Sequence, residues 1–481
     1  MSGTDTSIKR TNTQPKAIKK RKTHDKNGNL LNKCTYINPI KNRQCGMECR
    51  KDQIYCFAHI HLLTTTIKEE SNSNLNNKKL ELNKLIIKSN SMTIPPSDLT
   101  KLSKNGSIVK RVPCPVDPTH SIWEDKLKGH ILKCNATKKK NHLKEMEKNV
   151  DWYSCNYNVL DSPNINNDKT EIDEKIWIEL LDKWVKLHDG QFDELELNEI
   201  EYTDGLEQRF EELKNQKHIR QQSSLIGQLF NAGLIGDNRI IIEFGCGRAE
   251  FSRYLNKAID NKYQQIKVET KYLLIDRENP RLKFDAKICS DSEELGTKSV
   301  VERLKVDIKD LKLHSALNKF KKSESKLGYI GISKHLCGVA TDLTLRCLSN
   351  EVSDDSSNNF EFLGFLVAMC CRHCCQWDWL LPESKEYLAQ FGIDFSNFKY
   401  FRKMFSWATN GINEGFTKDD TGDHFSGLTF GEREQVGLKM RRILDESRKY
   451  AMVKRGFNVE LVKYVKRDYS LENICMLIKK Q

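Results

Sequence analysis

The sequence of 481 residues lacks any long hydrophobic run. No stretch approaches the roughly 20 apolar residues of a membrane-spanning helix. The first ten residues, MSGTDTSIKR, are polar where a secretory signal would be apolar, so we expect the chain to stay in the cytoplasm or nucleus. Those compartments are reducing, and the 16 cysteines therefore indicate metal ligation or buried thiols rather than a disulfide framework.

The N-terminal part has little acidic charge. Residues 1–50 contain 12 Lys and Arg against 3 Asp and Glu, and residues 51–150 contain 18 against 10, within a net charge of +13. A basic arm attracts phosphates regardless of base sequence, which favours a nucleic-acid partner. The alternative interpretation is a disordered lysine-rich tail or a nuclear-localisation segment.

The C-terminal part has the pattern of an α/β domain. Apolar residues recur at helical spacing from Ile176 to Leu187, which indicates the start of a folded domain. Short apolar runs at 239–244, 271–276, 329–333 and 362–370 then alternate with longer mixed segments. This alternation is typical of a parallel sheet with crossover helices, so we predict a Rossmann-like α/β domain. We expect two small zinc-binding modules to precede this domain.

Composition also suggests the module boundaries. Polar stretches rich in Asn, Ser and Lys have too little apolar content for a core and read as a tail or as linkers. The expected segments are a disordered basic tail at 1–32, a first zinc module at 33–62, a linker at 63–108, a second zinc module at 109–138, a linker at 139–172 and the α/β domain at 173–481.

The first zinc module is predicted from cysteines and histidines clustered between residues 34 and 61. This segment has almost no hydrophobic core, and a structural zinc ion would supply the missing folding energy. Cys49 and His61 are possible substitute ligands, and incidental cysteines in a basic loop are the alternative. The preferred ligands are Cys34, Cys45, Cys56 and His59.

The second zinc module has a sharper pattern. Cys114 and His120 are separated by five residues, while His130 and Cys134 lie at positions i and i+4 of an expected helix after Trp123. Residues four apart share one helical face, so both side chains can reach the same ion. The sequence therefore predicts two structural zinc ions in all.

The cofactor hypothesis starts from the apolar run that ends in Glu243, followed by Gly245 and Gly247 in a tight turn. A third glycine in dinucleotide spacing is missing, and an acid that opens the turn favours the cationic amino-acid end of S-adenosylmethionine (SAM). Asp276 ends the next strand, where a carboxylate can bind a ribose diol, and Asp307 is a candidate for the adenine side. For each acid the alternative is a helix cap or a surface charge.

Two further strand ends carry polar groups, in the segments 333–342 and 369–377. Methyl transfer to a hydroxyl needs a group that removes the acceptor proton, and Lys334, His335 and His373 are candidates. The second segment could instead bind a third metal ion or hold buried thiols. Its possible ligands are Cys370, Cys371, His373, Cys374 and Cys375.

In order, these motifs resemble the eukaryotic tRNA ribose 2′-O-methyltransferase family that modifies the fourth nucleotide of the acceptor stem. The resemblance covers about residues 33–480 and includes EFGCGRAEFS, LLIDR, DIKDL and SKHLCGVATDLTLRCL. The second module is similar to the CHHC finger of a minor-spliceosome protein. The resemblance implies methyl transfer from SAM to a tRNA ribose, with Cys337 added to the catalytic neighbourhood.

One departure from the family pattern concerns the cysteine block. The family block has two cysteines followed by two histidines, whereas Arg372 stands here at the first histidine position and Cys375 is added. A mechanism that needs both histidines is therefore not expected. The rival functions are a non-enzymatic RNA-binding zinc protein of the splicing or RNA-processing machinery, and a methyltransferase acting on protein or a small molecule.

Overall fold

The computed structural model describes residues 37–38, 43–44, 100–102, 108–159, 172–236, 238–266, 268–321, 326–353, 359–409 and 415–481. The chain divides into two compact units, Met1–His142 and Leu143–Gln481, and each is described by itself. No helix within these residues is both long enough and apolar enough to cross a bilayer.

Within its described residues, the first unit contains two small antiparallel sheets. One pairs β1 (Ile37–Asn38) with β2 (Arg43–Gln44), and the four predicted ligands of the first zinc module, Cys34, Cys45, Cys56 and His59, lie outside the described residues. The other sheet leads into the short helix that carries His130. Its elements are β3 (Thr100–Leu102), β4 (Ile108–Pro113), β5 (Ser121–Trp123) and α2 (Leu127–Lys133).

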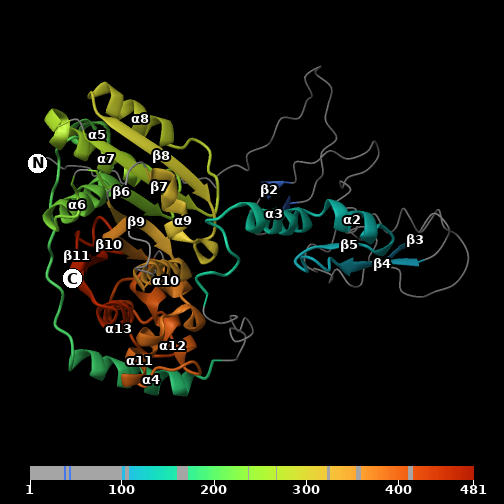
Figure 1. Cartoon of the computed structure of the whole chain (residues 1–481). Helices are drawn as coiled ribbons and strands as arrows, with labels where there is room; N and C mark the ends of the chain where they lie inside the picture. Colours follow the sequence, from blue (N-terminus) through green and yellow to red (C-terminus); the bar gives the residue numbers. More distant parts are fainter. Residues whose placement is uncertain are drawn as a thin grey trace, which may run out of the picture. The chain divides into compact units, whose positions relative to one another are not determined.

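The second unit is built on a seven-stranded sheet in the order β11-β12-β10-β9-β6-β7-β8 (Figure 1). The five strands from β10 to β8 are parallel, and β12 is inserted antiparallel between β10 and β11. The strands are β6 (Ile240–Phe244), β7 (Glu269–Asp276), β8 (Lys298–Lys305), β9 (Leu327–Cys337), β10 (Phe360–Cys370), β11 (Phe457–Lys463) and β12 (Ile474–Lys480).

This architecture confirms the Rossmann-like α/β prediction. The central strand β6 is IIIEF, and all five of its residues are buried because helices cover both faces of the sheet. Strands buried on both faces read as continuous apolar runs rather than as alternating patterns. The four apolar runs identified in the sequence are therefore the four central strands β6, β7, β9 and β10.

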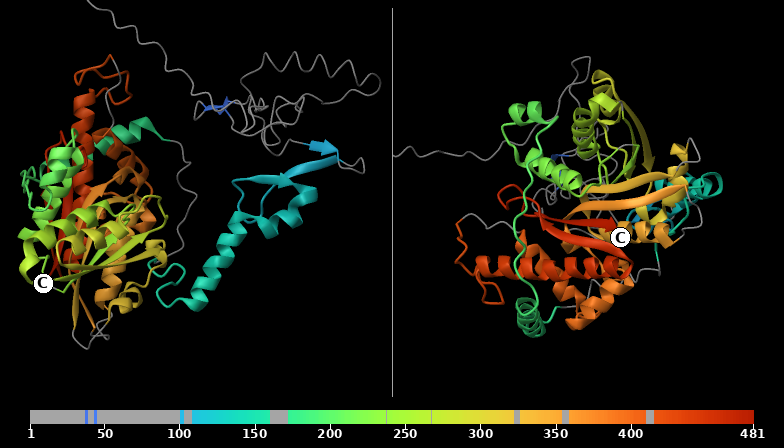
Figure 2. Two further views of the ribbon diagram at one scale, coloured as in Figure 1. Left: turned by 90° about the horizontal axis from the view of Figure 1, so that it is seen from above. Right: turned by 60° about the vertical axis from the view of Figure 1, so that its left-hand side comes forward.

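Alternate side chains of each central strand pack into two separate hydrophobic cores, one on each face of the sheet. On β6, Ile240 and Ile242 pack with residues of α9, α10 and α13, while Ile241 packs with residues of α6, α7 and α8. Figures 1 and 2 show these helix groups on opposite faces of the sheet. The covering helices are α6 (Lys217–Asn231), α7 (Glu250–Tyr263), α8 (Asp285–Glu294), α9 (Leu313–Leu317), α10 (Val339–Ser353) and α13 (Phe430–Lys454).

A third core lies among α4 (Glu174–Asp189), α11 (Pro382–Gln390), α12 (Phe398–Met404) and α13. Asp173 caps α4 by accepting hydrogen bonds from the backbone of Lys175 and Ile176. Helical spacing predicted Ile176 on the buried face, but the residue is 46% exposed and Trp177 is buried in its place. The buried face of α4 packs against α11, α12 and α13 and not against the sheet.

The stretch expected to be a linker at 139–172 is partly folded. Helix α3 (Asn135–Asn149) ends inside it, and Tyr153 is buried and forms a bridge to Leu311 beside β8. The Asn158 side chain donates to the carbonyls of Ile308 and Leu311 at 2.7 and 2.8 Å. Residues 143–159 therefore belong to the second unit.

Candidate cofactor and catalytic site

The chain order of the sheet reverses at β6, which lies between β7 on one side and β9 on the other. In open parallel sheets ligands bind outside the carboxyl ends of the strands at such a switch point. The glycine turn follows β6, and Lys334 and His335 lie near the carboxyl end of β9. The topology therefore brings together two motifs that are far apart in the sequence.

The turn after β6 needs glycine at its first position. Gly245 has φ +65°, and a Cβ added there would lie 3.2 Å from the backbone carbonyl oxygen of His335. Gly247 has φ +48° with open space where a side chain would be, and Ala249 is also left-handed at +63° just before α7. The turn thus exposes its backbone on one side while packing against β9 on the other.

Two neighbouring strands hold this turn. The Asp276 carboxylate, at the end of β7, accepts a hydrogen bond from the Gly247 amide at 2.8 Å and from the Glu278 amide at 2.7 Å. Arg303 on β8 donates to the Gly247 carbonyl at 2.9 Å and forms a two-point ion pair with Asp285. Both the amide and the carbonyl of Gly247 are therefore fixed by side chains.

Glu243 connects the end of β6 to the first turn of α7. One carboxylate oxygen accepts hydrogen bonds from the backbone amide and the hydroxyl of Ser252, at 3.2 and 2.5 Å. Burial raises the pKa of Glu243 to about 7, although the bonds from Ser252 act in the opposite direction. A buried carboxylate of this kind favours a cation placed beside it.

A cavity of about 250 Å³ opens between the glycine turn, α6 and β9. Inside it, the Lys334 Nζ lies 3.2 Å from His218 Nδ1. Lys334 is 6% exposed and His335 is solvent-accessible. The lining residues are His218, Gln222, Glu243, Gly245, Cys246, Gly247, Arg248, Glu250, Phe251, Lys334 and His335.

Lys334, His218 and His335, which all line this cavity, have lowered pKa values. Burial lowers the pKa of Lys334 to about 8. The charge of Lys334, and then burial, lower the pKa of His218. Desolvation and the charge of Lys334 lower the pKa of His335, although part of that residue is exposed. Near neutral pH the cavity therefore holds neutral imidazoles and an amine that can lose its proton.

Three predicted site residues, all within the described part of the chain, do not line this cavity. Asp276 borders it through the Gly247 amide. Asp307 follows β8 and caps the next turn by accepting from the Lys309 amide at 3.2 Å, as the helix-cap alternative expected. His373 is exposed in the turn after β10, one strand beyond Lys334 and His335.

Sequence reasoning missed His218 and Gln222. Both lie on α6, more than 20 residues before the glycine turn, and only the packing of α6 over the sheet brings them to the cavity. The sequence carries no local signal for them, because only the structure shows that α6 buries a polar run that an ordinary surface helix would expose. That run comprises Gln221, Gln222, Ser223 and Ser224.

The four predicted ligands of the second zinc module converge. The Sγ atoms of Cys114 and Cys134 lie 3.9 Å apart, and the Nε2 atoms of His120 and His130 lie 3.0 Å apart. All four ligand atoms are within 4.8 Å of one another. Cys134 directly follows α2 instead of lying on it, because its extended ψ of 133° ends the helix. Soft sulfur and imidazole donors at this spacing fit a tetrahedral zinc ion.

The cysteine block after β10 separates into two parts. Cys375 is fully buried, whereas Cys370 and Cys371 approach Cys337 at the end of β9. Arg372 points into the protein, where it pairs with Asp445 through bonds of 2.7 to 3.1 Å and with Glu472 at 2.6 Å. The residue at the family's first histidine position is therefore part of a buried ion-pair network.

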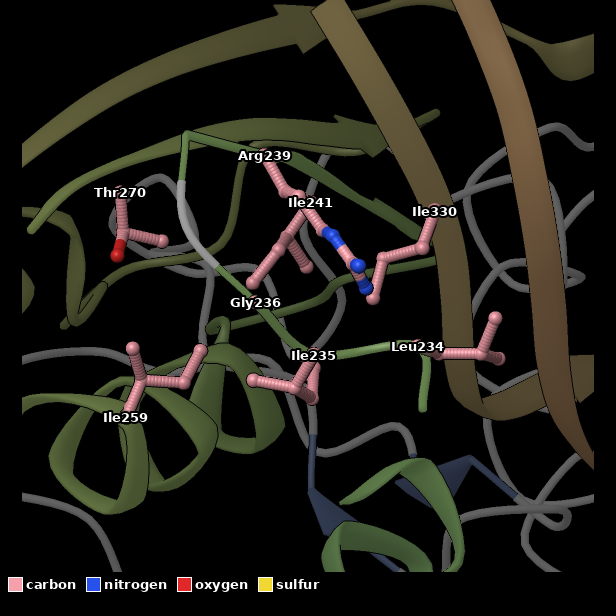
Figure 3. Close-up of a pocket in the computed structure, with 8 residues that line it drawn as sticks. All are labelled: Leu234, Ile235, Gly236, Arg239, Ile241, Ile259, Thr270 and Ile330. Carbon is pink, nitrogen blue, oxygen red and sulfur yellow. The ribbon is translucent and has the colours of Figure 1, made fainter. Parts of the chain in front are cut away.

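A second pocket, with no room for a water molecule, lies at the opposite end of β6 (Figure 3). Arg239 extends there among Leu234, Ile241 and Ile330, and its guanidinium donates to the Gly233 carbonyl at 3.0 Å. The remaining lining residues are apolar or small. We infer that these eight residues pack the end of the sheet and do not bind a ligand.

Comparison with known families gives three matches. A family described as "Methyltransferase TRM13" matches residues 220–479. A "CCCH zinc finger in TRM13 protein" matches residues 32–60, and a "U11-48K-like CHHC zinc finger" matches residues 111–135.

Several curated relatives are similar over most of their length. Proteins named "tRNA:m(4)X modification enzyme TRM13" from Scheffersomyces stipitis and Saccharomyces cerevisiae are 37% and 34% identical. The alignments cover 91% and 93% of this chain, and 98% and 96% of those proteins. Among solved structures, the plantazolicin methyltransferase BpumL bound to SAH is 11% identical, with a TM-score of 0.21 over 64% of this chain and 96% of that one.

Proposed function

Because the chain belongs to the methyltransferase TRM13 family, we propose that it methylates the ribose 2′-hydroxyl of nucleotide 4 in the tRNA acceptor stem, with SAM as donor. Family membership confirms the resemblance inferred from the motifs. The relatives' name supports tRNA as the substrate. The observation that carries the chemistry is the Lys334–His218 pair beside the glycine turn.

The cavity fits the donor at its polar end. Glu243 would hold the cationic amino group, since one of its oxygens remains for a ligand when the other accepts from Ser252. The open backbone at Gly247 allows close approach, and Asp276, held at the end of β7 by two backbone amides, would bind the ribose. When bound, SAM supplies a methyl group activated by its sulfonium.

Lys334 is the proposed general base. In its neutral form the amine takes the proton of the 2′-hydroxyl while the oxygen bonds to the methyl carbon and the carbon–sulfur bond breaks. His218 accepts a hydrogen bond from Lys334 at 3.2 Å and so orients the amine. His335, accessible in the same cavity, would contact the acceptor nucleotide.

The zinc modules and the basic N-terminal part would hold the tRNA. An A-form stem displays its 2′-hydroxyls in a wide, shallow minor groove, so a ribose can be selected by shape and phosphate contacts without unpairing bases. The excess of Lys and Arg in residues 1–150 suits such contacts. We place the reaction in the cytoplasm or nucleus, where tRNA is found.

The test is methyl transfer from labelled SAM to tRNA that lacks the modification, followed by nuclease digestion and mass spectrometry. Wild type should produce one 2′-O-methylated nucleotide at position 4. Lys334→Arg and Lys334→Met should both lower kcat by about 10² to 10⁴, because neither can accept the proton. The wild-type rate should rise with pH and level off above about 8, where Lys334 becomes neutral.

Lys480→Met is the matched control, since Lys480 pairs with Glu361 at the far end of β12. It should keep the wild-type rate. SAM binding by each variant confirms that the cavity is intact. Full activity of Lys334→Arg would mean that Lys334 acts through its positive charge and not as a base. Absence of methyl transfer to any tRNA by zinc-loaded wild type would favour a purely RNA-binding role for the protein.

A further inference from the structure

We propose that Cys337, Cys370 and Cys371 bind a third zinc ion, separate from those of the two fingers. The three Sγ atoms lie within 4.8 Å of one another. They come from the carboxyl ends of two adjacent parallel strands, β9 and β10, and from the residue that follows β10. Thiolates are the ligands that zinc prefers in structural and catalytic sites.

The spacing fits a zinc ion. Sheet register places Cys370 directly beside Cys337, and their Sγ atoms are 3.4 Å apart. Around a tetrahedral ion with bonds of about 2.3 Å, neighbouring sulfurs lie roughly 3.8 Å apart. Cys114 and Cys134 of the CHHC finger are separated by 3.9 Å, so the β9–β10 cluster is about as compact as an accepted zinc module.

The surroundings hold the ligands rigidly. Cys371 has the left-handed φ of +46°, and its amide donates to the Glu472 carboxylate at 3.1 Å. Glu472 and Asp445 in turn bind the buried guanidinium of Arg372, which also donates to the Met369 carbonyl. Metal ligands are commonly oriented by such outer hydrogen bonds. Arg372 is thus linked to Cys371 through Glu472.

The site has an accessible side. Cys337 is exposed, and the cluster contains three ligands among the residues that the structure describes. Three protein ligands leave a fourth position for water or another oxygen ligand, as in catalytic zinc sites. Cys337 lies two residues after His335, so the ion would sit beside the cofactor cavity at the carboxyl end of β9.

A disulfide is the competing chemistry. Forming one between Cys337 and Cys370 would require the sulfurs to close from 3.4 Å to about 2.05 Å. It would also leave Cys371 unpaired. Disulfides are disfavoured in the reducing compartments expected for this chain, whereas zinc binding is compatible with them.

The experiment measures zinc per full-length chain by inductively coupled plasma mass spectrometry after purification in reductant. We expect three zinc ions in wild type, and two in both Cys370→Ser and Cys337→Ser. Cys155→Ser is the matched control, because Cys155 is an exposed cysteine outside the cluster, and it should retain three. The readout needs no methyl transfer, so it stands or fails independently of the proposed function.

Circular dichroism checks that each variant is folded. Cobalt substitution adds a second readout, because each thiolate ligand that is removed should weaken the sulfur-to-cobalt absorption. Equal zinc content in wild type and in folded Cys370→Ser overturns the proposal. So does a Cys337–Cys370 disulfide found by mass spectrometry in the freshly isolated wild type.

Discussion

At the scale of single residues, the candidate site contains two buried ionisable side chains, Glu243 and Lys334. Glu243 is 4% exposed and Lys334 is 6% exposed, and burial shifts both pKa values toward neutrality. A carboxylate and an amine that titrate near pH 7 to 8 can bind a cation and accept a proton, respectively. Neither shift was readable from the sequence, since each depends on α6 and α7 covering the strand ends.

Replacing Glu243 by Gln should weaken SAM binding while leaving the fold intact. Loss of one charged hydrogen bond costs about 1.5–3 kcal/mol, or roughly a 10- to 150-fold rise in Kd. Glu278→Gln, in the turn after Asp276, is the control and should bind normally. Isothermal titration calorimetry measures the affinity of both variants for SAM. If Glu243→Gln binds SAM as tightly as wild type, Glu243 only stabilises the first turn of α7 through Ser252.

The same substitution has a pH signature. The folded pKa of Glu243 lies above its ordinary value, so the folded state binds the proton more tightly than the unfolded state does. The stability of the cofactor-free protein should therefore fall as pH rises from about 4.5 to about 7. The Gln variant should lack this component of the pH dependence, which urea unfolding at several pH values would detect.

At the scale of elements, the glycine turn is in contact with four strands of the sheet. It follows β6, receives side chains from β7 and β8, and packs against the His335 carbonyl of β9. The turn can therefore be distorted in two ways that give different results. A side chain can press on β9, or it can protrude into the open space.

Gly245→Ala should lower stability more than Gly247→Ala does. Both positions have positive φ, which costs a non-glycine residue about 1–2 kcal/mol, but only position 245 adds a 3.2 Å contact with a backbone oxygen. Gly247→Ala should instead raise the Kd for SAM, because its methyl group would point into open space within the cavity lining. Urea unfolding and calorimetry separate the two effects, and the reverse ranking would contradict this geometry.

The sequence was sufficient to predict four central strands, but it did not show which distant segments pack against them. Continuous apolar runs predicted β6, β7, β9 and β10, because strands buried on both faces carry that pattern. The contribution of His218 depends on how α6 crosses the sheet, and Cys337 meets Cys370 through strand register. Such contacts between distant segments have no local sequence signal. The bridge between Tyr153 and Leu311 is another contact of this kind.

At the scale of the whole molecule, charge is divided along the chain. The basic excess is concentrated in residues 1–150, while the remaining residues, including the catalytic machinery, are slightly acidic in sum. If residues 1–150 attract the tRNA as proposed, substrate binding and methyl transfer depend on different parts of the chain. Methyl transfer should accordingly respond to salt mainly through tRNA binding.

Deleting residues 1–32, which carry eight Lys and Arg, should raise the Kd for tRNA without changing kcat at saturating tRNA. The slope of log affinity against log salt should become shallower by about 0.7–0.9 for each phosphate that the shortened chain no longer neutralises. Filter binding across a salt series, together with initial rates, tests this. An unchanged slope would assign the segment to localisation instead of substrate binding.

The insertion of β12 between β10 and β11 has a consequence for biosynthesis. Every other strand of the sheet precedes β12 in the chain, yet β12 alone joins β11 to the parallel strands. While the ribosome is still translating, β10 therefore presents an unpaired edge, the kind of surface on which chains aggregate. The seven-stranded sheet is complete only when residues 474–480 have emerged, so we expect shielding of the nascent chain by chaperones to aid its folding.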